Sequence, residues 1–195
     1  MSTVESQAVD SALEVECLGP GLLVLVVGPS GAGKDTLLAY ARRQLADSDV
    51  LFARRRITRA SDHTEDHLSI DEAAFEQGVA EGRFPLSWRA NGLGYALGEE
   101  VREAILNGRT VVANGSRATV AEARKRFQRI KVVLVTAPAS VLAARIKARG
   151  REAHEDVAQR MAREPTLDAP PDVGIMNDGA IEQAGERLVA YLRGL

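Results

Sequence analysis

Residues 28–36 read GPSGAGKDT and follow directly on the apolar run Leu22–Val27. This pattern predicts a buried strand, a glycine-rich turn and the start of a helix. The three glycines allow the backbone to turn tightly, so that its N–H groups can approach an anion closely. The helix behind the turn directs its positive end at the same place, and Lys34 adds a positive charge that can follow a phosphate through a reaction. The segment therefore predicts a site for the phosphates of a nucleotide.

One position of this segment departs from the usual signature. The lysine is normally followed by Ser or Thr, whose hydroxyl binds Mg²⁺, whereas here Asp35 follows it and Thr36 comes one residue later. Asp35 is either an anionic metal ligand or an acidic residue that the helix dipole favours in a first turn. Both interpretations stay open, as does the choice between Asp35 and Thr36 as the metal ligand. The predicted nucleotide-binding residues are Gly28, Pro29, Ser30, Gly31, Ala32, Gly33, Lys34, Asp35 and Thr36.

Composition narrows the class of protein. The chain has 195 residues, 45% of them hydrophobic and 27% charged, which suits one soluble α/β domain with a sizeable core. A net charge of −2 supplies no global field that would draw the chain to nucleic acid or to a membrane. No apolar run approaches the length of a membrane span, and the acidic N-terminus is unlike a secretory signal. Cys17 is the only cysteine, so an intrachain disulfide is excluded. We expect a cytoplasmic enzyme.

Strand-like and helix-like segments alternate along the chain, which predicts an α/β fold with a parallel, doubly wound sheet. We expect a flexible, polar extension over residues 1–19 and a single domain over residues 20–195. The expected strands are 22–27, 50–58, 110–113, 131–136 and 173–176, with short strands and turns over 84–98. The expected helices are 34–45, 71–81, 99–107, 118–127, 140–149, 155–163 and 180–192. A polar loop is expected over 59–69.

Two clusters of arginine could supply the positive charge that phosphoryl transfer needs. The first comprises Arg54, Arg55, Arg56 and Arg59 and follows the expected second strand, whose carboxyl end should face the nucleotide loop. The second comprises Arg145, Arg149 and Arg151; the first two are one helical turn apart and share a helix face. A solvated basic face is the alternative interpretation of each cluster.

With these pieces in place, the chain resembles the guanylate-kinase-like branch of the nucleoside monophosphate kinases. Within that branch it is most similar to the ribose 1,5-bisphosphate phosphokinases. The resemblance extends from Leu22 to the C-terminus. It rests on these strings: GPSGAGKD, RRRITR at 54–59, LSWRANGLGY at 86–95, VVANGSRA at 111–118, IKARGRE at 146–152 and MNDG at 176–179.

The resemblance implies a P-loop NTPase fold that holds ATP and Mg²⁺, with a small acceptor-binding subdomain near residues 54–98 and a helical lid near 145–163. It implies that Lys34, Arg145 and Arg149 are catalytic and that Arg151 and Asn177 contact ATP, the latter on the adenine side. It also implies that Arg59 and Tyr95 hold the acceptor. Arg56 of the first arginine cluster, His67 and Arg117 are further candidate acceptor residues. For His67 an ordinary surface-loop histidine is an equal alternative.

The departures from guanylate kinases indicate a different acceptor. The second phosphate-binding arginine of those enzymes is replaced within 60–62, Ser87 stands where they read guanine with a glutamate, and residues 114–117 read NGSR where they carry a second acid. A guanine base would lose its carboxylate partners, whereas a sugar carrying two phosphates needs donors and positive charge.

The resemblance therefore implies a kinase that phosphorylates the 1-phosphate of ribose 1,5-bisphosphate, giving 5-phosphoribosyl 1-diphosphate (PRPP) and ADP in phosphonate degradation. The alternatives are a guanylate or other nucleoside monophosphate kinase and a non-catalytic guanylate-kinase-like module that binds a protein. A GTPase switch is disfavoured because the Asn-Lys-x-Asp motif that reads guanine is missing from the sequence. The sequence does not predict an oligomeric state.

Overall fold

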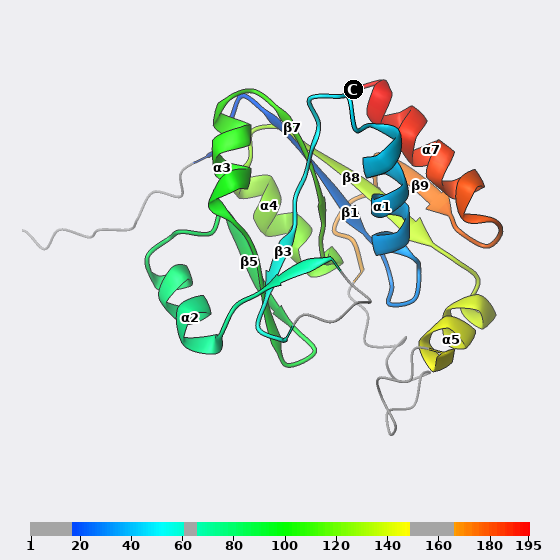
Figure 1. Cartoon of the computed structure of the whole chain (residues 1–195), viewed down its shortest axis with the longest axis horizontal. Helices are drawn as coiled ribbons and strands as arrows, with labels where there is room; N and C mark the ends of the chain where they lie inside the picture. The colour runs from blue at the N-terminus through cyan, green and yellow to red at the C-terminus, as the bar shows by residue number, and fades with distance from the viewer. Residues whose placement is uncertain (1–16, 61–65, 149–165) are drawn as a thin grey trace, which may run out of the picture.

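The computed structural model describes residues 17–60, 66–148 and 166–195 of the chain. These residues form a parallel sheet covered by helices on both faces and a second, smaller sheet beside it (Figure 1). The strands are β1 (Leu22–Val27), β2 (Leu51–Phe52), β3 (Arg55–Ile57), β4 (His67–Ser69), β5 (Leu86–Ala90), β6 (Leu93–Leu97), β7 (Thr110–Asn114), β8 (Ile130–Thr136) and β9 (Val173–Met176). The helices are α1 (Lys34–Gln44), α2 (Glu72–Ala80), α3 (Glu99–Leu106), α4 (Val120–Arg126), α5 (Ala139–Ala148) and α7 (Ile181–Arg193), with a 3-10 turn at Arg117–Thr119.

Strand β1 is at the centre of the larger sheet, whose order is β2-β7-β1-β8-β9. All four strand pairs in this sheet are parallel. The carboxyl ends of β1, β7, β8 and β9 therefore lie at one edge of the sheet, where ligands bind in doubly wound α/β proteins.

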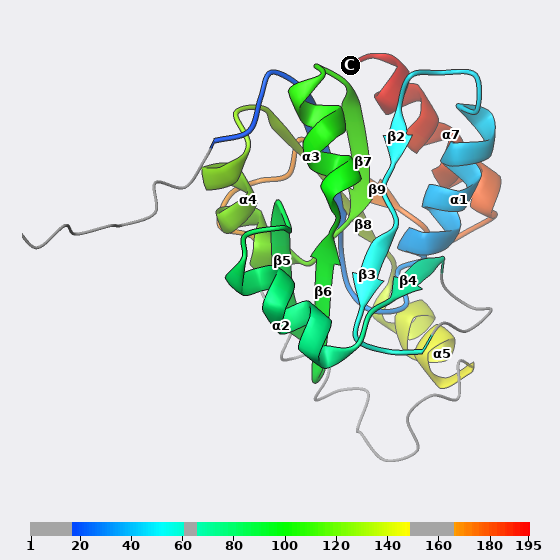
Figure 2. The ribbon, with the colours of Figure 1, turned by 60° about the vertical axis from the view of Figure 1, so that its left-hand side comes forward.

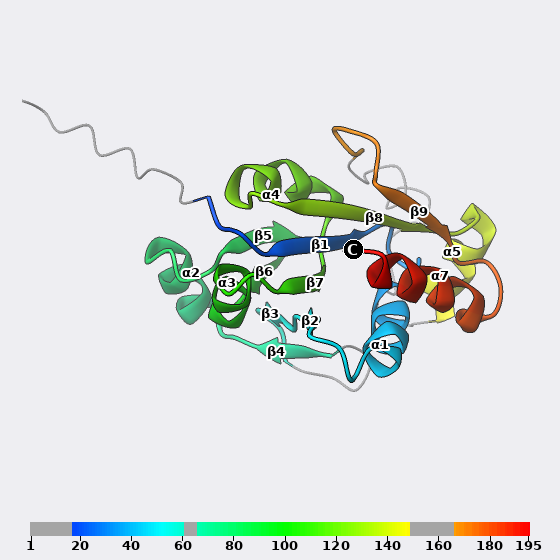
Figure 3. The ribbon, with the colours of Figure 1, turned by 90° about the horizontal axis from the view of Figure 1, so that it is seen from above.

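Both faces of β1 are buried, because its six residues alternate between two hydrophobic clusters. Val24 and Val26 pack in a cluster with side chains of α1 and α7. Leu23 and Leu25 point to the other face and pack with α3 and α4. Figure 3 shows the sheet between these two layers of helices. This double burial explains why β1 reads as a continuous apolar run rather than as an alternating pattern.

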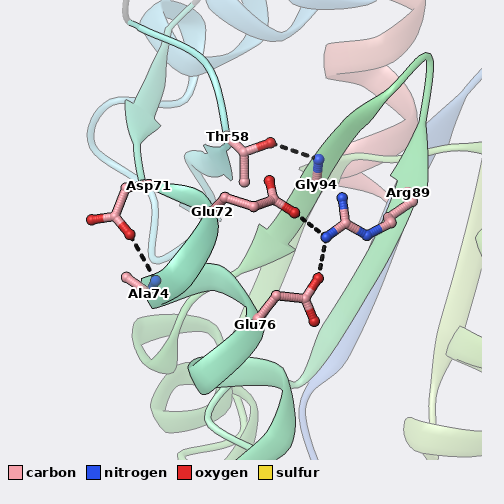
Figure 4. Close-up of polar contacts among 7 residues, drawn as sticks. All are labelled: Thr58, Asp71, Glu72, Ala74, Glu76, Arg89 and Gly94. Atoms are coloured by element: carbon pink, nitrogen blue, oxygen red, sulfur yellow. Dashed lines mark hydrogen bonds and ion pairs between the residues drawn. The ribbon is translucent and has the colours of Figure 1, made fainter.

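The smaller sheet has the order β4-β3-β6-β5 (Figure 2) and mixes parallel and antiparallel pairs. One of its faces is covered by α2: Phe75 of that helix packs with Ala96. Helix α2 begins where the Asp71 carboxylate accepts a hydrogen bond of 2.7 Å from the N–H of Ala74 (Figure 4), which is the usual capping arrangement. Arg89 on the same face is paired with Glu72 and Glu76 of α2.

The α/β class and the parallel sheet are confirmed, and β1 and β9 have the expected bounds. The single strand expected over 50–58 is wrong: β2 belongs to the large sheet and β3 to the small one. The loop expected over 59–69 is also wrong at its end, because 67–69 form β4 against β3. Both errors have one cause, namely that β3 pairs with β4 and β6, and neither pairing is visible in the local sequence.

Several expected segments fall outside the described residues, among them the helix over 155–163 and most of the extension over 1–19. The last residues of that extension are packed in the fold. Leu18 is buried and pairs with Phe127, and its N–H donates to the carbonyl of Arg126 at 2.7 Å. Across the described ranges, no helix is both long enough and apolar enough to span a membrane.

We predict that Leu188→Ala destabilises the protein by about 2–5 kcal/mol, the usual cost of a cavity in a packed core. Leu188 is fully buried in the cluster that joins α7 to α1 and β1. Urea unfolding measures the change, and Leu195→Ala is the matched control because Leu195 is 43% exposed. The control should change the unfolding free energy by less than about 0.5 kcal/mol; equal effects of the two variants would contradict this description of the core.

Candidate functional site: a nucleotide loop facing an arginine and an aromatic pair

The loop between β1 and α1 has a backbone that requires glycine at two points. Gly28 has φ +147°, and a Cβ atom there would overlap the carbonyl oxygen of Val135 in the neighbouring strand β8. Gly33 has φ +88° and is the residue from which α1 starts; a Cβ there would overlap the Asn177 side chain. Side chains are strained in this region of φ. The loop is therefore held against β8 and Asn177, and its backbone can closely approach a ligand at the N-terminus of α1.

The Lys34 side chain folds back along this loop. Its Nζ donates to the carbonyl oxygens of Gly28 at 2.8 Å and Pro29 at 3.0 Å. The ammonium group is thus held at the mouth of the loop. This position suits a residue that contacts the outer phosphates of a nucleotide.

Asp35 points from the first turn of α1 towards β7 and β3. Its Oδ1 accepts a hydrogen bond of 2.6 Å from Nδ2 of Asn114, the buried last residue of β7. The same oxygen accepts one of 3.2 Å from Arg55 of β3, with which Asp35 forms an ion pair. Thr36 is exposed. Asp35 is therefore more than a favourable charge at a helix start, because it joins α1 to both sheets.

Arg145 and Asn177 form a second wall of the loop. Nη1 of Arg145 donates to the carbonyl oxygen of Asn177 at 3.0 Å and of Gly31 at 3.4 Å. The buried Asn177 side chain donates through Nδ2 to the carbonyl oxygen of Ala32 at 2.8 Å. Oδ1 of Asn177 is buried and accepts no hydrogen bond from the described part of the chain. The structure thus brings Arg145 of α5 and Asn177, after β9, to the nucleotide loop.

Across from the loop, the face of the small sheet opposite α2 carries an aromatic pair. Tyr95 of β6 and Trp88 of β5 are cross-strand partners, and their rings stack with centroids 5.4 Å apart and planes 6° apart. The guanidinium carbon of Arg55 lies 5.7 Å from the centroid of the Tyr95 ring, within cation–π distance.

Three further predicted acceptor residues lie near strand ends. Arg59 follows β3 in a bend, and its Nε is buried. Arg117 is half-buried in the 3-10 turn behind β7. His67 was expected in a loop, but it is a buried residue of β4, in register with Arg55.

Among the predicted acceptor residues, Arg56 points away from the nucleotide loop. Successive side chains of a strand point to opposite faces, and Arg56 is paired across β6 with Ala96, on the face that α2 covers. Its Nη1 donates to both carboxylate oxygens of Glu100 in α3, at 3.0 and 3.1 Å. Arg55, one residue earlier, occupies the loop-facing position. Arg149 and Arg151 lie outside the described residues.

Arg55 and Asn114 are partners of Asp35 that were not predicted from the sequence. In the sequence Arg55 stands out only as a member of an arginine cluster, and Asn114 only as a departure from guanylate kinases. A period-two pattern that places Arg55 and Ile57 on one face could have separated Arg55 from Arg56. To use this pattern, one has to know that a new strand starts at residue 55.

A second ionic contact joins α1 to the small sheet. The Asp66 carboxylate, one residue before β4, contacts Arg42 of α1 at 2.5 Å and Arg54 at 2.6 Å. Burial alone raises the pKa of Asp66, but the hydrogen bonds and charges of these two arginines outweigh it and lower the pKa below its ordinary value of 3.8. Asp35 and Arg42 are seven residues apart in α1, so they share a helix face.

The loop fits the phosphates of a nucleotide. A lysine at its mouth, a backbone that only glycine allows and the start of α1 together provide donors and positive potential in one place. Within the described residues there is no group of three or more His, Cys, Asp or Glu side chains that could hold a metal ion by itself. The fold and this site define a P-loop nucleotide-binding protein.

Comparisons with known proteins narrow this class. A family model described as an AAA domain matches residues 23–166. Over 175 residues the chain is 55% identical to ribose 1,5-bisphosphate phosphokinase PhnN of Methylobacterium radiotolerans, covering 89% of this chain and 98% of the relative. The PhnN protein of Rhizobium etli is 47% identical over 179 residues, which cover 90% and 91% of the two chains.

The guanylate kinase of Anaplasma phagocytophilum has the same fold, with a TM-score of 0.61 and 16% identity over 92% of this chain and 87% of that one. The chain belongs to the ribose 1,5-bisphosphate phosphokinase family and is a kinase with a P-loop.

We predict that Asp66→Asn lowers stability at neutral pH and that the difference from the unchanged protein disappears in acid. A carboxyl group whose pKa is lowered by folding stabilises the fold above its unfolded pKa and loses this effect as pH falls through the folded value. The difference in unfolding free energy should therefore be full above about pH 4 and vanish well below it. Urea unfolding across pH 2–7 measures it. A difference in unfolding free energy that does not change with pH would contradict the assigned ion pairs. So would a difference at neutral pH that stays the same when salt is added.

Proposed function

We propose that the protein transfers the γ-phosphoryl group of ATP to the 1-phosphate of ribose 1,5-bisphosphate, yielding PRPP and ADP in phosphonate degradation in the cytoplasm. The observation that carries the proposal is that relatives named for this substrate match nearly the whole chain. Arg55 contacts Asp35 at the start of α1 and lies over the ring of Tyr95, so the predicted acceptor residue Tyr95 is connected to the nucleotide loop.

On the donor side, the loop residues 28–36 would hold the phosphates of ATP, with Asn177 on the adenine side. Thr36 and the second carboxylate oxygen of Asp35, whose Oδ1 already accepts from Arg55 and Asn114, are the groups that would hold Mg²⁺, which prefers to keep water and phosphate oxygens among its ligands. When bound, Mg²⁺ supplies charge neutralisation for the β- and γ-phosphates. Lys34 and Arg145 add fixed positive charge beside the loop, and they cost little reorganisation because the loop carbonyls already hold them.

On the acceptor side, Arg59, Tyr95, His67 and Arg117 would bind ribose 1,5-bisphosphate in a subdomain over residues 54–98. An oxygen of its 1-phosphate forms a bond to the γ-phosphorus, and the bond from that phosphorus to the β–γ bridging oxygen breaks. The electron pair leaves with ADP. The attacking phosphate is already ionised near neutral pH, so the chain needs to align and neutralise rather than to remove a proton. A lid over residues 145–163, with Arg149 and Arg151, would exclude water.

Initial rates of ADP release with three acceptor conditions test this proposal. We expect turnover with ribose 1,5-bisphosphate and only background release with GMP or without acceptor, because side chains of the expected acceptor region offer cations and amides in place of the acids that read guanine. Turnover with GMP alone would instead show a guanylate kinase. Background release under all three conditions would favour a non-catalytic binding module.

Lys34→Ala should lower kcat on the order of 100- to 1,000-fold, the usual loss when one preorganised donor is removed from a developing charge. Thermal unfolding should show that the variant is folded. Lys125→Ala is the control, since that lysine side chain is 73% exposed on α4. Turnover by Lys34→Ala close to that of the control would contradict the role assigned to Lys34.

A further inference from the structure

Arg55 contacts both halves of the site. It starts β3 in the small sheet, and its guanidinium group reaches Asp35 at the start of α1 while lying over Tyr95. Tyr95 in turn stacks on Trp88. We call these four residues the Arg55 row: Asp35, Arg55, Tyr95 and Trp88. The row runs from the P-loop helix across three strands of the small sheet.

The charges in this row are matched. The Arg55 side chain is 12% exposed and that of Asp35 is 30% exposed, so the guanidinium group has lost most of its water and needs a counter-ion. A Ser or Thr at position 35 would offer a hydroxyl but no charge. The carboxylate that breaks the usual signature is therefore the group that allows an arginine to be held here.

The hydrogen bonds of Asp35 also limit its use as a metal ligand. Its Oδ1 already accepts hydrogen bonds from Arg55 and from Asn114. A cation on that oxygen would lie beside the guanidinium group and be repelled by it. The contacts therefore favour a structural use of Oδ1, namely holding Arg55 against the Tyr95 ring.

We propose that Arg55 is a positioning residue, which Asp35 holds over Tyr95 so that the acceptor is aligned with the nucleotide loop. This rests on the proposed function, in which Tyr95 binds the acceptor. Arg55 acts through Tyr95: the cation fixes the ring face, and the ion pair fixes the ring relative to α1. Small displacements between reacting groups are costly, about 100-fold for a shift of 1 Å.

Steady-state kinetics of Arg55→Met test the proposal. We expect kcat/KM for ribose 1,5-bisphosphate to fall about 10- to 100-fold, while KM for ATP stays within about twofold. Arg89→Met is the matched control. Arg89 is also an arginine of the small sheet, and its guanidinium carbon lies 5.1 Å from the centroid of an aromatic ring, that of Phe75. It is paired with carboxylates as well, but it lies on the α2 face (Figure 4). A loss no larger than that of the control would overturn the proposal, as would an equal loss in the use of ATP.

The link between Arg55 and Asp35 is tested with Asp35→Asn and the double variant. If Asp35 acts by holding Arg55, the double variant should lose no more acceptor kcat/KM than the more affected single variant. Losses that multiply would show that the two residues act separately and would overturn the link. Arg55→Lys keeps a positive charge but lacks the planar guanidinium group, so its acceptor kcat/KM should lie between those of the unchanged protein and Arg55→Met. Full activity would contradict the role given to the guanidinium group over Tyr95.

A ligand-free measurement separates this inference from the proposed function. Trp88 is the only tryptophan in the chain, so its quenching by acrylamide reports on the far end of the Arg55 row. Arg55→Met should quench more readily than the unchanged protein, because Tyr95 loses the cation that fixes it, and Arg89→Met should not. If the unchanged protein fails to use ribose 1,5-bisphosphate, the proposed function fails while this measurement still tests the row. Unchanged quenching in Arg55→Met would overturn the positioning role whatever the turnover.

Discussion

The approach of the nucleotide loop to β8 constrains the rest of the structure. Gly28 lies so close to the carbonyl oxygen of Val135 that no side chain fits, and from there the backbone turns to start α1 at Gly33. Because β1 is buried between two helical layers, the position of this turn is fixed by the core. The loop therefore presents its backbone and Lys34 without needing a ligand to shape it, which is the preorganisation that charge-stabilising catalysis requires.

A second constraint is the ionic connection between α1 and the small sheet. Asp35 contacts Arg55 near the start of the helix, and Arg42 contacts Asp66 about two turns further along the same helix face. The two pairs have opposite polarity, so sliding the sheet along the helix would bring like charges together. Single surface ion pairs contribute little stability, but two pairs of opposite polarity favour one position of the small sheet along α1. The connection thus specifies where the acceptor lies relative to the loop.

The parts of the site that are local in sequence could be predicted, and those that depend on distant pairing could not. The bounds of β1 and the place of Lys34 follow from the apolar run and the glycine spacing. The split of 50–58 into two strands depends on β6, some 40 residues away, and it decides which arginine faces the loop. For this reason the local sequence pointed to Arg56, which pairs with Glu100 in the structure, and not to Arg55. Substrate identity came from resemblance, since charge and spacing alone fit many phosphorylated acceptors.

In the proposed reaction a phosphate group, and not a hydroxyl or water, receives the phosphoryl group. A phosphorus-31 NMR spectrum of the reaction mixture tests it most directly. With ATP and ribose 1,5-bisphosphate, we expect the 1-phosphate signal to be replaced by the coupled pair of signals of a diphosphate, in step with the appearance of ADP. Accumulation of inorganic phosphate while the 1-phosphate signal stays unchanged would contradict it.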